Sequence, residues 1–467
     1  MLVVAALFCA LGANAQVSNP SSATNPYYGS ITAHPATDDV IRLSLDEAIH
    51  RGLENNLGLK QAEYAENAIH GEKLQALQEF LPTISLTGNS GFHQYNLAAL
   101  GFGQGTLAQF APGGLPPGFS LITRATVTEG QIQYKQTLFS GPVIAGWRAA
   151  GAATRAAHFG TTRARGEVVQ QVATAYLHAL AAASEVDNAR ALEQENQVAL
   201  NQAHEAHVAG TASNLDELRA RVQLQSQQQV LIRAQNDLDK YLILLKREIG
   251  LDPGQKIVLT DPTPYGDLAS QTPEEVRASA FKNRQDYLQL QNTVEELKAV
   301  HSAYRAQRLP TLSFSGNYGV TQVGGVGAHG TFMAMGTLSF PIFREARLRG
   351  DEEASRAQFD AANSQLEDLR GNIDQQVRSG LLDVNATAKL VEVSRSNVEL
   401  ATRTLSDETD RVNAGVDDNL ALVTAQASLA RAQTRLVESL YQYNLSKLAL
   451  ARYAGVLEQQ YRVYLGR

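Results

Sequence analysis

The sequence contains little of what stabilises large globular cores or disulfide-rich domains. Its 467 residues include one cysteine, one tryptophan and three methionines, and aromatic residues make up 7% of the chain. The cysteine, Cys9, lies in a short apolar run that ends in Ala13-Asn14-Ala15, an A-x-A cleavage pattern. Residues 1–15 are therefore predicted to be a signal peptide. The exported chain would then hold no disulfide, no reactive thiol and no cysteine-ligated metal.

Charge and motif content exclude further classes. The formal net charge is −7, and no cluster of lysine and arginine suits a nucleic acid. The sequence has no G-x-S-x-G, P-loop, H-E-x-x-H or strand-to-helix G-x-G-x-x-G motif. His204 and His207 are three residues apart and do not fit zinc-site spacing, so we interpret them as helix surface. We predict no catalytic residue, no cofactor, no metal site and no enzyme activity.

The chain contains an internal repeat. Leu81-Pro82-Thr83-Ile84-Ser85-Leu86 recurs as Leu309-Pro310-Thr311-Leu312-Ser313-Phe314, and Ile249-Gly250-Leu251 recurs as Ala454-Gly455-Val456. Two versions of one structural unit are therefore predicted. We place an irregular leader at 16–42, the first repeat at 43–251, a linker at 252–272, the second repeat at 273–456 and a tail at 457–467. Each repeat should begin with a helix.

Four segments alternate between apolar and polar residues, a pattern typical of strands. They lie at 83–92 and 128–139 in the first repeat and at 311–320 and 331–341 in the second. Ile84, Leu86, Ile132 and Leu138 belong to the apolar faces. Each segment is about ten residues long, which suits a tilted strand that crosses a bilayer. Alternation alone is equally compatible with a soluble, half-buried sheet.

Apolar residues at a spacing of seven predict long coiled-coil helices. Val377, Val384, Val391 and Val398 keep this spacing, and Leu224, Leu231, Leu238 and Leu245 do so in the first half. Helical hairpins are therefore predicted at 143–250 and 343–455. No run after residue 16 reaches 18 consecutive apolar residues, so no transmembrane helix is expected.

Each helical hairpin has a glycine-containing bend at its tip. The tips are Val208, Ala209, Gly210 and Thr211 in the first repeat and Asn413, Ala414, Gly415 and Val416 in the second. The glycines suit the residue after a helix C-terminus, and Ser213 or Asn214 suits the next N-cap. Asp216, Asp417 and Asp418 follow the bends. These acids fit either favourable interaction with the helix dipole or a ring of negative charge around an opening.

The order of these parts resembles the outer-membrane efflux proteins of the TolC type. It comprises two units of Leu-Pro-Thr, strand, loop, strand, proline, long helix, Ala-Gly turn, helix and glycine, from about residue 43 to 456. The resemblance implies a mixed α/β membrane protein whose homotrimer forms a 12-stranded transmembrane β-barrel, with four strands per subunit. A long periplasmic α-helical coiled-coil barrel would continue it. Several copies are also needed because open sheet edges do not persist in lipid.

The implied function is that of an outer-membrane export duct in a tripartite efflux or type I secretion system. The resemblance implies a periplasmic adaptor (membrane fusion) protein that docks on the hairpin tips, and an inner-membrane pump of the RND or ABC type. Asp216, Asp417 and Asp418 would line the tunnel mouth. The expected surroundings are outer-membrane lipid and periplasm in a Gram-negative-type cell, with no nucleic acid. The alternative is a periplasmic or surface coiled-coil scaffold without a channel.

Overall fold

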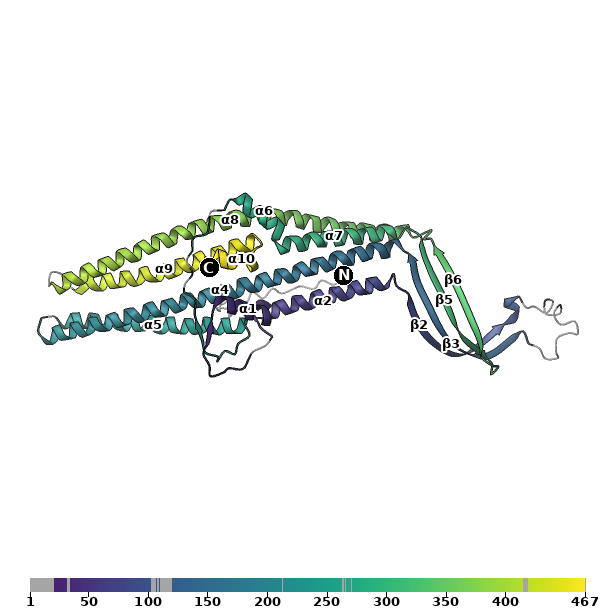
Figure 1. The fold of residues 1–467 in the computed structure, drawn as a ribbon, viewed down its shortest axis with the longest axis horizontal. Helices are drawn as coiled ribbons and strands as arrows, with labels where there is room; N and C mark the ends of the chain where they lie inside the picture. Colours follow the sequence, from purple (N-terminus) through teal and green to yellow (C-terminus); the bar gives the residue numbers. More distant parts are fainter. Residues whose placement is uncertain are drawn as a thin grey trace, which may run out of the picture. The chain divides into compact units, whose positions relative to one another are not determined.

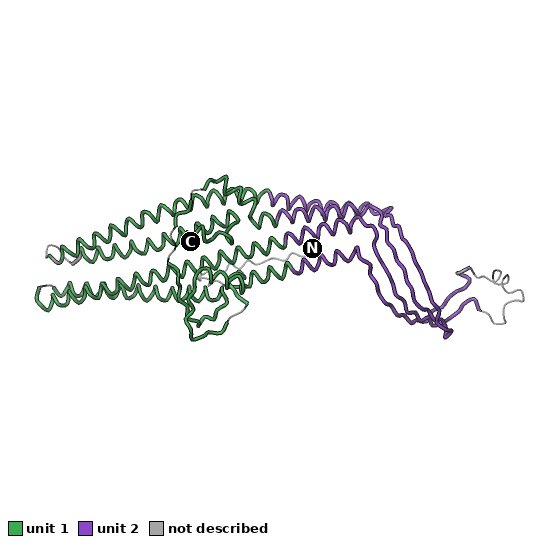
Figure 2. Tube along the Cα trace, in the orientation of Figure 1, with its two compact units in different colours: residues 1–66, 157–289, 367–467 green, residues 67–156, 290–366 purple. Residues whose placement is uncertain are grey.

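A computed structural model describes residues 21–31, 34–101, 106, 109, 120–211, 213–262, 264, 266–269, 271–414 and 419–466 (Figure 1). The chain divides into two compact units (Figure 2). Unit 1 draws on Met1–Glu66, Ala157–Gln289 and Glu367–Arg467, and unit 2 on Asn67–Ala156 and Leu290–Leu366. Unit 2 holds the four long strands, and unit 1 holds the tips of the helical hairpins.

The two halves contain the same sequence of main elements. The first half has η1 (Pro26–Tyr28), β1 (Ile41–Leu43), α1 (Leu45–Asn55), α2 (Leu57–Gln78), β2 (Thr83–Asn96), η2 (Leu97–Leu100), β3 (Ile122–Phe139), α4 (Gly141–Val208), α5 (Asn214–Glu248) and β4 (Ile257–Leu259). The second has α6 (Pro273–Asn283), α7 (Gln285–Ala306), β5 (Thr311–Val323), β6 (His329–Ser339), α8 (Glu345–Asn413), α9 (Asn419–Tyr453) and α10 (Leu457–Tyr464).

Local sequence explains where the shorter helices begin and break. The Ser44 hydroxyl accepts a hydrogen bond from the Glu47 backbone N–H at 3.2 Å and caps α1. Thr272 and Glu275 form a capping box at the start of α6, with Pro273 in its first turn. The initial helix of each repeat is interrupted once, at Asn56 and at Arg284, and both residues have extended backbone angles. The sequence pattern did not predict these interruptions.

Most of the predicted heptad positions are buried in the long helices of unit 1. Val377, Val384 and Val391 on α8 and Leu224 and Leu245 on α5 are buried, whereas Val398, Leu231 and Leu238 are half-buried. The apolar spacing of seven thus identifies the faces along which these helices pack. Of the described helices, none combines the length and hydrophobicity needed to cross a membrane.

The four long strands of unit 2 form one antiparallel sheet in the order β2-β3-β5-β6. β2 and β5 begin where predicted, at Thr83 and Thr311, and β3 ends where predicted, at Phe139. The other limits differ, and β2 and β3 extend furthest beyond them, to Asn96 and back to Ile122. The pairing of β3 with β5 shifts between Thr137 and Phe139. Phe139 therefore lies opposite Leu312, and Leu138 has no partner on β5 in this register. A bulge adds one residue and interrupts the alternation.

Three segments outside the two predicted repeats contain regular structure. The leader at 16–42 contributes most of β1, the linker at 252–272 contributes β4, and these strands pair in parallel with Ile41 opposite Ile257. The tail at 457–467 forms α10. The buried Tyr176 on α4 donates from its Oη to the Leu43 carbonyl at 3.1 Å. These elements depend on partners far away in the chain, which a local pattern does not reveal.

Candidate functional site

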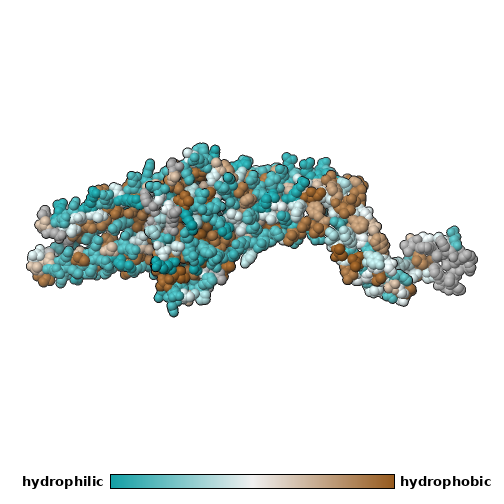
Figure 3. Space-filling model, in the orientation of Figure 1, coloured by the Kyte–Doolittle hydropathy of each residue, from teal (hydrophilic) through white to brown (hydrophobic). Residues whose placement is uncertain are grey.

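The sheet of unit 2 separates apolar from polar side chains. Leu86, Ile132, Tyr318 and Phe332 are successive partners across β2, β3, β5 and β6, so they lie on one face. All four are more than half exposed, with Leu86 at 80%. We call the row and its same-face neighbours the apolar band. The neighbours are Ile84, Tyr134, Leu312, Phe314, Val320 and Leu338. Hydrophobic surface is visible over the strands in Figure 3.

The opposite face of the sheet is polar and internally hydrogen bonded. Gln133 Nε2 donates to Thr87 Oγ1 at 3.1 Å, and Asn317 Nδ2 donates to Gln131 Oε1 at 2.7 Å. These bonds join neighbouring strands on the face away from the apolar band. An exposed apolar face of this extent on four strands is unusual for a surface in water and suits contact with lipid.

The tip of the first helical hairpin is a complete Schellman motif. Gly210 has φ +73°, its N–H donates to the His207 carbonyl at 3.0 Å, and the Thr211 N–H donates to the Ala206 carbonyl at 2.9 Å. The prediction that Gly210 follows the helix C-terminus is confirmed. A Cβ at Gly210 would meet no atom within 4 Å. Val208, Leu215 and Leu218 nearby are apolar and exposed.

Asp216 takes part in the capping of α5. Its backbone N–H donates to Ser213 Oγ at 3.3 Å, and its carboxylate accepts from the Ser213 N–H at 3.2 Å. Hydrogen bonds from Ser213 lower the pKa of Asp216, and Arg219 lowers it further. Capping therefore accounts for an acid at this position.

A charged cluster behind the first tip was missed from the sequence. The buried Glu217 carboxylate lies 2.7 Å from His207 Nδ1, 3.3 Å from His204 Nδ1 and 2.9 Å from Arg221 Nη2. The hydrogen bond with His207 lowers the pKa of Glu217, with help from His204 and Arg221. The spacing of the two histidines puts both on the side of α4 that faces α5. Within the described residues, no group of three or more His, Cys, Asp or Glu could hold a metal ion.

The second tip is only partly described. The Ala414 N–H donates to the Asp410 carbonyl at 3.0 Å as α8 ends. Gly415, Val416, Asp417 and Asp418 lie outside the described residues, and the same holds for the side chain of Asn413. The structure therefore brings together the predicted residues of the first tip and gives no account of the predicted acids of the second.

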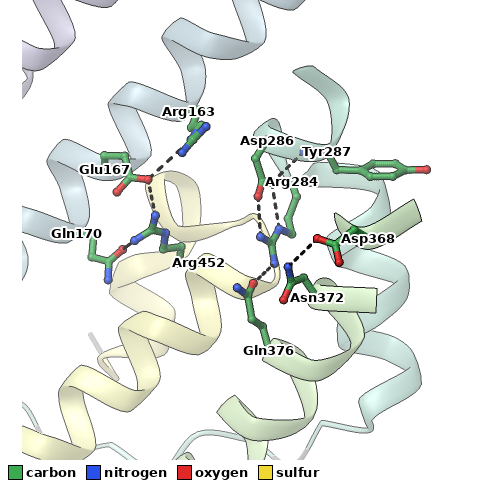
Figure 4. Close-up of polar contacts among 10 residues, drawn as sticks. All are labelled: Arg163, Glu167, Gln170, Arg284, Asp286, Tyr287, Asp368, Asn372, Gln376 and Arg452. Carbon is green, nitrogen blue, oxygen red and sulfur yellow. Dashed lines mark hydrogen bonds and ion pairs between the residues drawn. The ribbon is translucent and has the colours of Figure 1, made fainter. Parts of the chain in front are cut away.

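Unit 1 also contains a polar cavity of about 420 Å³, next to the helix break at Arg284. Arg284 makes two bonds to Asp286, at 2.6 and 3.0 Å, and one to Gln376 at 2.7 Å (Figure 4). Burial raises the pKa of Asp286, but the bonds from Arg284 outweigh it and lower the pKa overall. Arg452 pairs with Glu167. Because its acids are paired with arginines, this cavity is a structural junction between helices.

Comparisons with known proteins agree on one family. The model of the family "Outer membrane efflux protein" matches residues 48–251 and 276–456. The toluene efflux pump outer membrane protein TtgC of Pseudomonas putida is 25% identical over 51% of this chain and 50% of its own. The alkaline protease secretion protein AprF of Pseudomonas aeruginosa is 24% identical over 63% and 62%. The match thus spans about half the length of TtgC.

A solved structure has the same fold. A membrane protein from Pseudomonas aeruginosa superposes with a TM-score of 0.75 at 20% identity, covering 88% of this chain and 93% of the other. The fold, the duplicated order of parts and the family match over both repeats lead to one assignment. The chain belongs to the outer membrane efflux protein family.

Proposed function

We propose that this chain forms an outer-membrane export duct, which conducts substrates passively from a periplasmic adaptor and an inner-membrane pump to the exterior. The observation that carries the proposal is the apolar band on a four-stranded sheet whose edge strands, β2 and β6, have no second neighbour among the described strands. Such a sheet is stable in lipid only when copies close it. The outer membrane is the location of this family.

Three copies would give a 12-stranded barrel with the apolar band outside and the polar face inside. Residues 43–251 and 273–456 would be the two repeats of each subunit, with the helical hairpins in the periplasm. The duct would carry out no chemistry of its own. The proteins named above supply the analogy, because one belongs to a toluene efflux pump and the other to a protease secretion system.

Conductance measurements test the duct. Purified protein in planar bilayers should give discrete conductance steps, and its outer-membrane form should migrate on gels in a heat-modifiable way. The coiled-coil scaffold is the competing function, because it would also need long helices with heptad seams. A protein that remains in the soluble periplasmic fraction and gives no conductance would favour the scaffold and contradict the duct.

We further propose that the hairpin tips are the docking surface for the adaptor. The first tip supports this because Val208 is 74% exposed, Leu215 is 54% exposed and the backbone at Gly210 is open to close approach. Replacing Leu215 and Val208 with aspartate should abolish export, because an interface core tolerates charge poorly. Trimers should persist in the membrane. Export that continues at the wild-type level would show that this tip is not the contact.

The acids after the bends are proposed to line the tunnel mouth. Threefold symmetry would place three copies of Asp417 and three of Asp418 around one opening, with Asp216 less directly involved because it caps α5. The reversal potential in a salt gradient should then show cation preference, reduced in Asp417→Asn/Asp418→Asn. An unchanged preference in this variant would assign both acids to helix stabilisation alone.

A further inference from the structure

A second cavity in unit 1 lies between the two helical hairpins. It has a volume of about 430 Å³ and is lined by α4, α5 and α9. Three rings form part of its wall: His178 stacks on Tyr241 with ring centroids 3.8 Å apart, and on Tyr441 at 4.9 Å. Burial lowers the pKa of His178 and so disfavours a positive charge on this ring. The stack offers aromatic surface to the cavity.

Carboxylates line the same cavity. Glu185 on α4 and Glu438 on α9 both border it, and neither forms an ion pair within the part of the chain that the structure describes. Glu185 Oε2 accepts a hydrogen bond from Thr434 Oγ1 at 3.0 Å. Burial raises the pKa of Glu185, Thr434 opposes this rise, and the negative charge of Glu438 adds to it. A positive charge between the two carboxylates would relieve their repulsion.

The other two charged residues of the lining have opposite signs, so the excess negative charge is that of Glu185 and Glu438. Asp237 on α5 adds a third carboxylate, which lies 3.6 Å from Lys240, and Arg233 is the one guanidinium among the described lining residues. Aromatic rings attract cations through their faces, and this attraction grows when water is excluded. The cavity thus combines aromatic surface with an excess of negative charge.

We propose that this cavity binds a monovalent organic cation with an apolar or aromatic body. The charged centre would lie near Glu185 and Glu438, and the body would contact Tyr241 and Tyr441. This proposal rests on the proposed function in one respect, because it names a class of substrate that the duct would carry. Its volume suits a small drug-sized ion.

Tetraphenylphosphonium is a suitable probe. Isothermal titration calorimetry of the purified full-length trimer in detergent, with a micelle-only blank, should show saturable binding. Tetraphenylborate, which has the same shape and the opposite charge, should not bind. Glu185→Gln/Glu438→Gln should weaken binding about tenfold or more, and Tyr441→Leu should weaken it less. Arg233→Gln should strengthen it, because a like charge is removed.

Asp187→Asn is the matched control. Asp187 lies on the same helix, is exposed and does not border the cavity, and its loss changes the net charge by one, as does Glu185→Gln alone. Weakening by Asp187→Asn equal to that by Glu185→Gln, equal binding of tetraphenylborate, or unchanged binding in the double variant would each overturn the site. Conductance is measured separately. Binding without conductance would contradict only the proposed function, and conductance without binding would contradict only this site.

Discussion

At the scale of single residues, two glycines with the same backbone conformation have different surroundings. Gly210 has φ +73° and Gly455 has φ +76°. A Cβ at Gly210 would meet nothing within 4 Å, whereas one at Gly455 would lie 2.6 Å from the Arg284 backbone nitrogen. The sequence identifies both as helix-terminating glycines and cannot distinguish them, because the contact to Arg284 comes from a distant segment.

This difference predicts unequal effects of alanine. Gly210→Ala should lower the free energy of unfolding by about 1–2 kcal/mol, the cost of the left-handed conformation. Gly455→Ala should cost about 1–3 kcal/mol more, because the methyl group would also displace backbone. Urea denaturation of the purified protein, followed by circular dichroism at the helix band, measures both. Equal losses would contradict the close approach at Gly455.

Glu248 at the end of α5 makes stability depend on pH. The residue is fully buried, Gln171 Nε2 donates to its Oε1 at 3.0 Å, and its Oε2 has no hydrogen-bond partner within the described structure. Burial raises the pKa of Glu248 to about 8. A raised carboxyl pKa contributes stability that is complete below the unfolded value near 4.5 and is lost as pH rises through about 8.

The melting temperature should therefore fall between pH 5 and pH 8. The free energy of unfolding should fall by a few kcal/mol, because each unit of pKa difference between the folded and unfolded states corresponds to about 1.4 kcal/mol. Glu248→Gln should flatten this dependence because the amide does not ionise. Glu205→Gln, at an exposed position on α4, serves as the control and should keep the wild-type slope. A slope that persists in Glu248→Gln would assign the pH dependence to other groups.

At the scale of elements, features set by residues close together in the sequence could be predicted, and features set by residues far apart in the sequence could not. Alternation and heptad spacing are local, so they located the four strands and the buried seams of the long helices. The bulge near Leu138, the helix break at Arg284 and the pairing of Ile41 with Ile257 depend on distant partners. The contacts of Glu217 with His204 and His207 were missed because they cross from α4 to α5.

The two faces of β2 should respond differently to charge. Leu86 belongs to the apolar band, and its neighbour Ser85 lies on the polar face opposite Gln133. Leu86→Arg should cost roughly 2–4 kcal/mol if the band lies in the bilayer, because arginine is costly near the midplane. Ser85→Arg should be mild. Yield of folded protein in the outer membrane and its unfolding in detergent measure the effect, and equal losses would show that the faces are wrongly assigned.

At the scale of the whole molecule, the proposed duct needs more strands than one chain supplies. Among the described strands, the edge strands β2 and β6 of the unit 2 sheet each have one neighbour, and four strands cannot enclose a channel with their polar face. The family assignment and the apolar band are properties of one chain. The number of copies is a property of the assembly, so it stays a prediction that needs its own measurement.

Cysteine crosslinking between the edge strands can make that measurement. The predicted signal peptide contains the only cysteine, so introduced pairs would have no background in the exported chain. A cysteine that replaces Ser85 on β2 should crosslink to a cysteine introduced on β6 of a neighbouring copy. The reactive positions should be one or two of the odd-numbered ones from Thr331 to Thr337. The cysteine on β2 should not reach the even-numbered positions, because these lie on the apolar face. Closed assembly predicts trimers on denaturing gels. Crosslinking with no preference for one face, or ladders beyond three copies, would contradict a closed trimeric barrel.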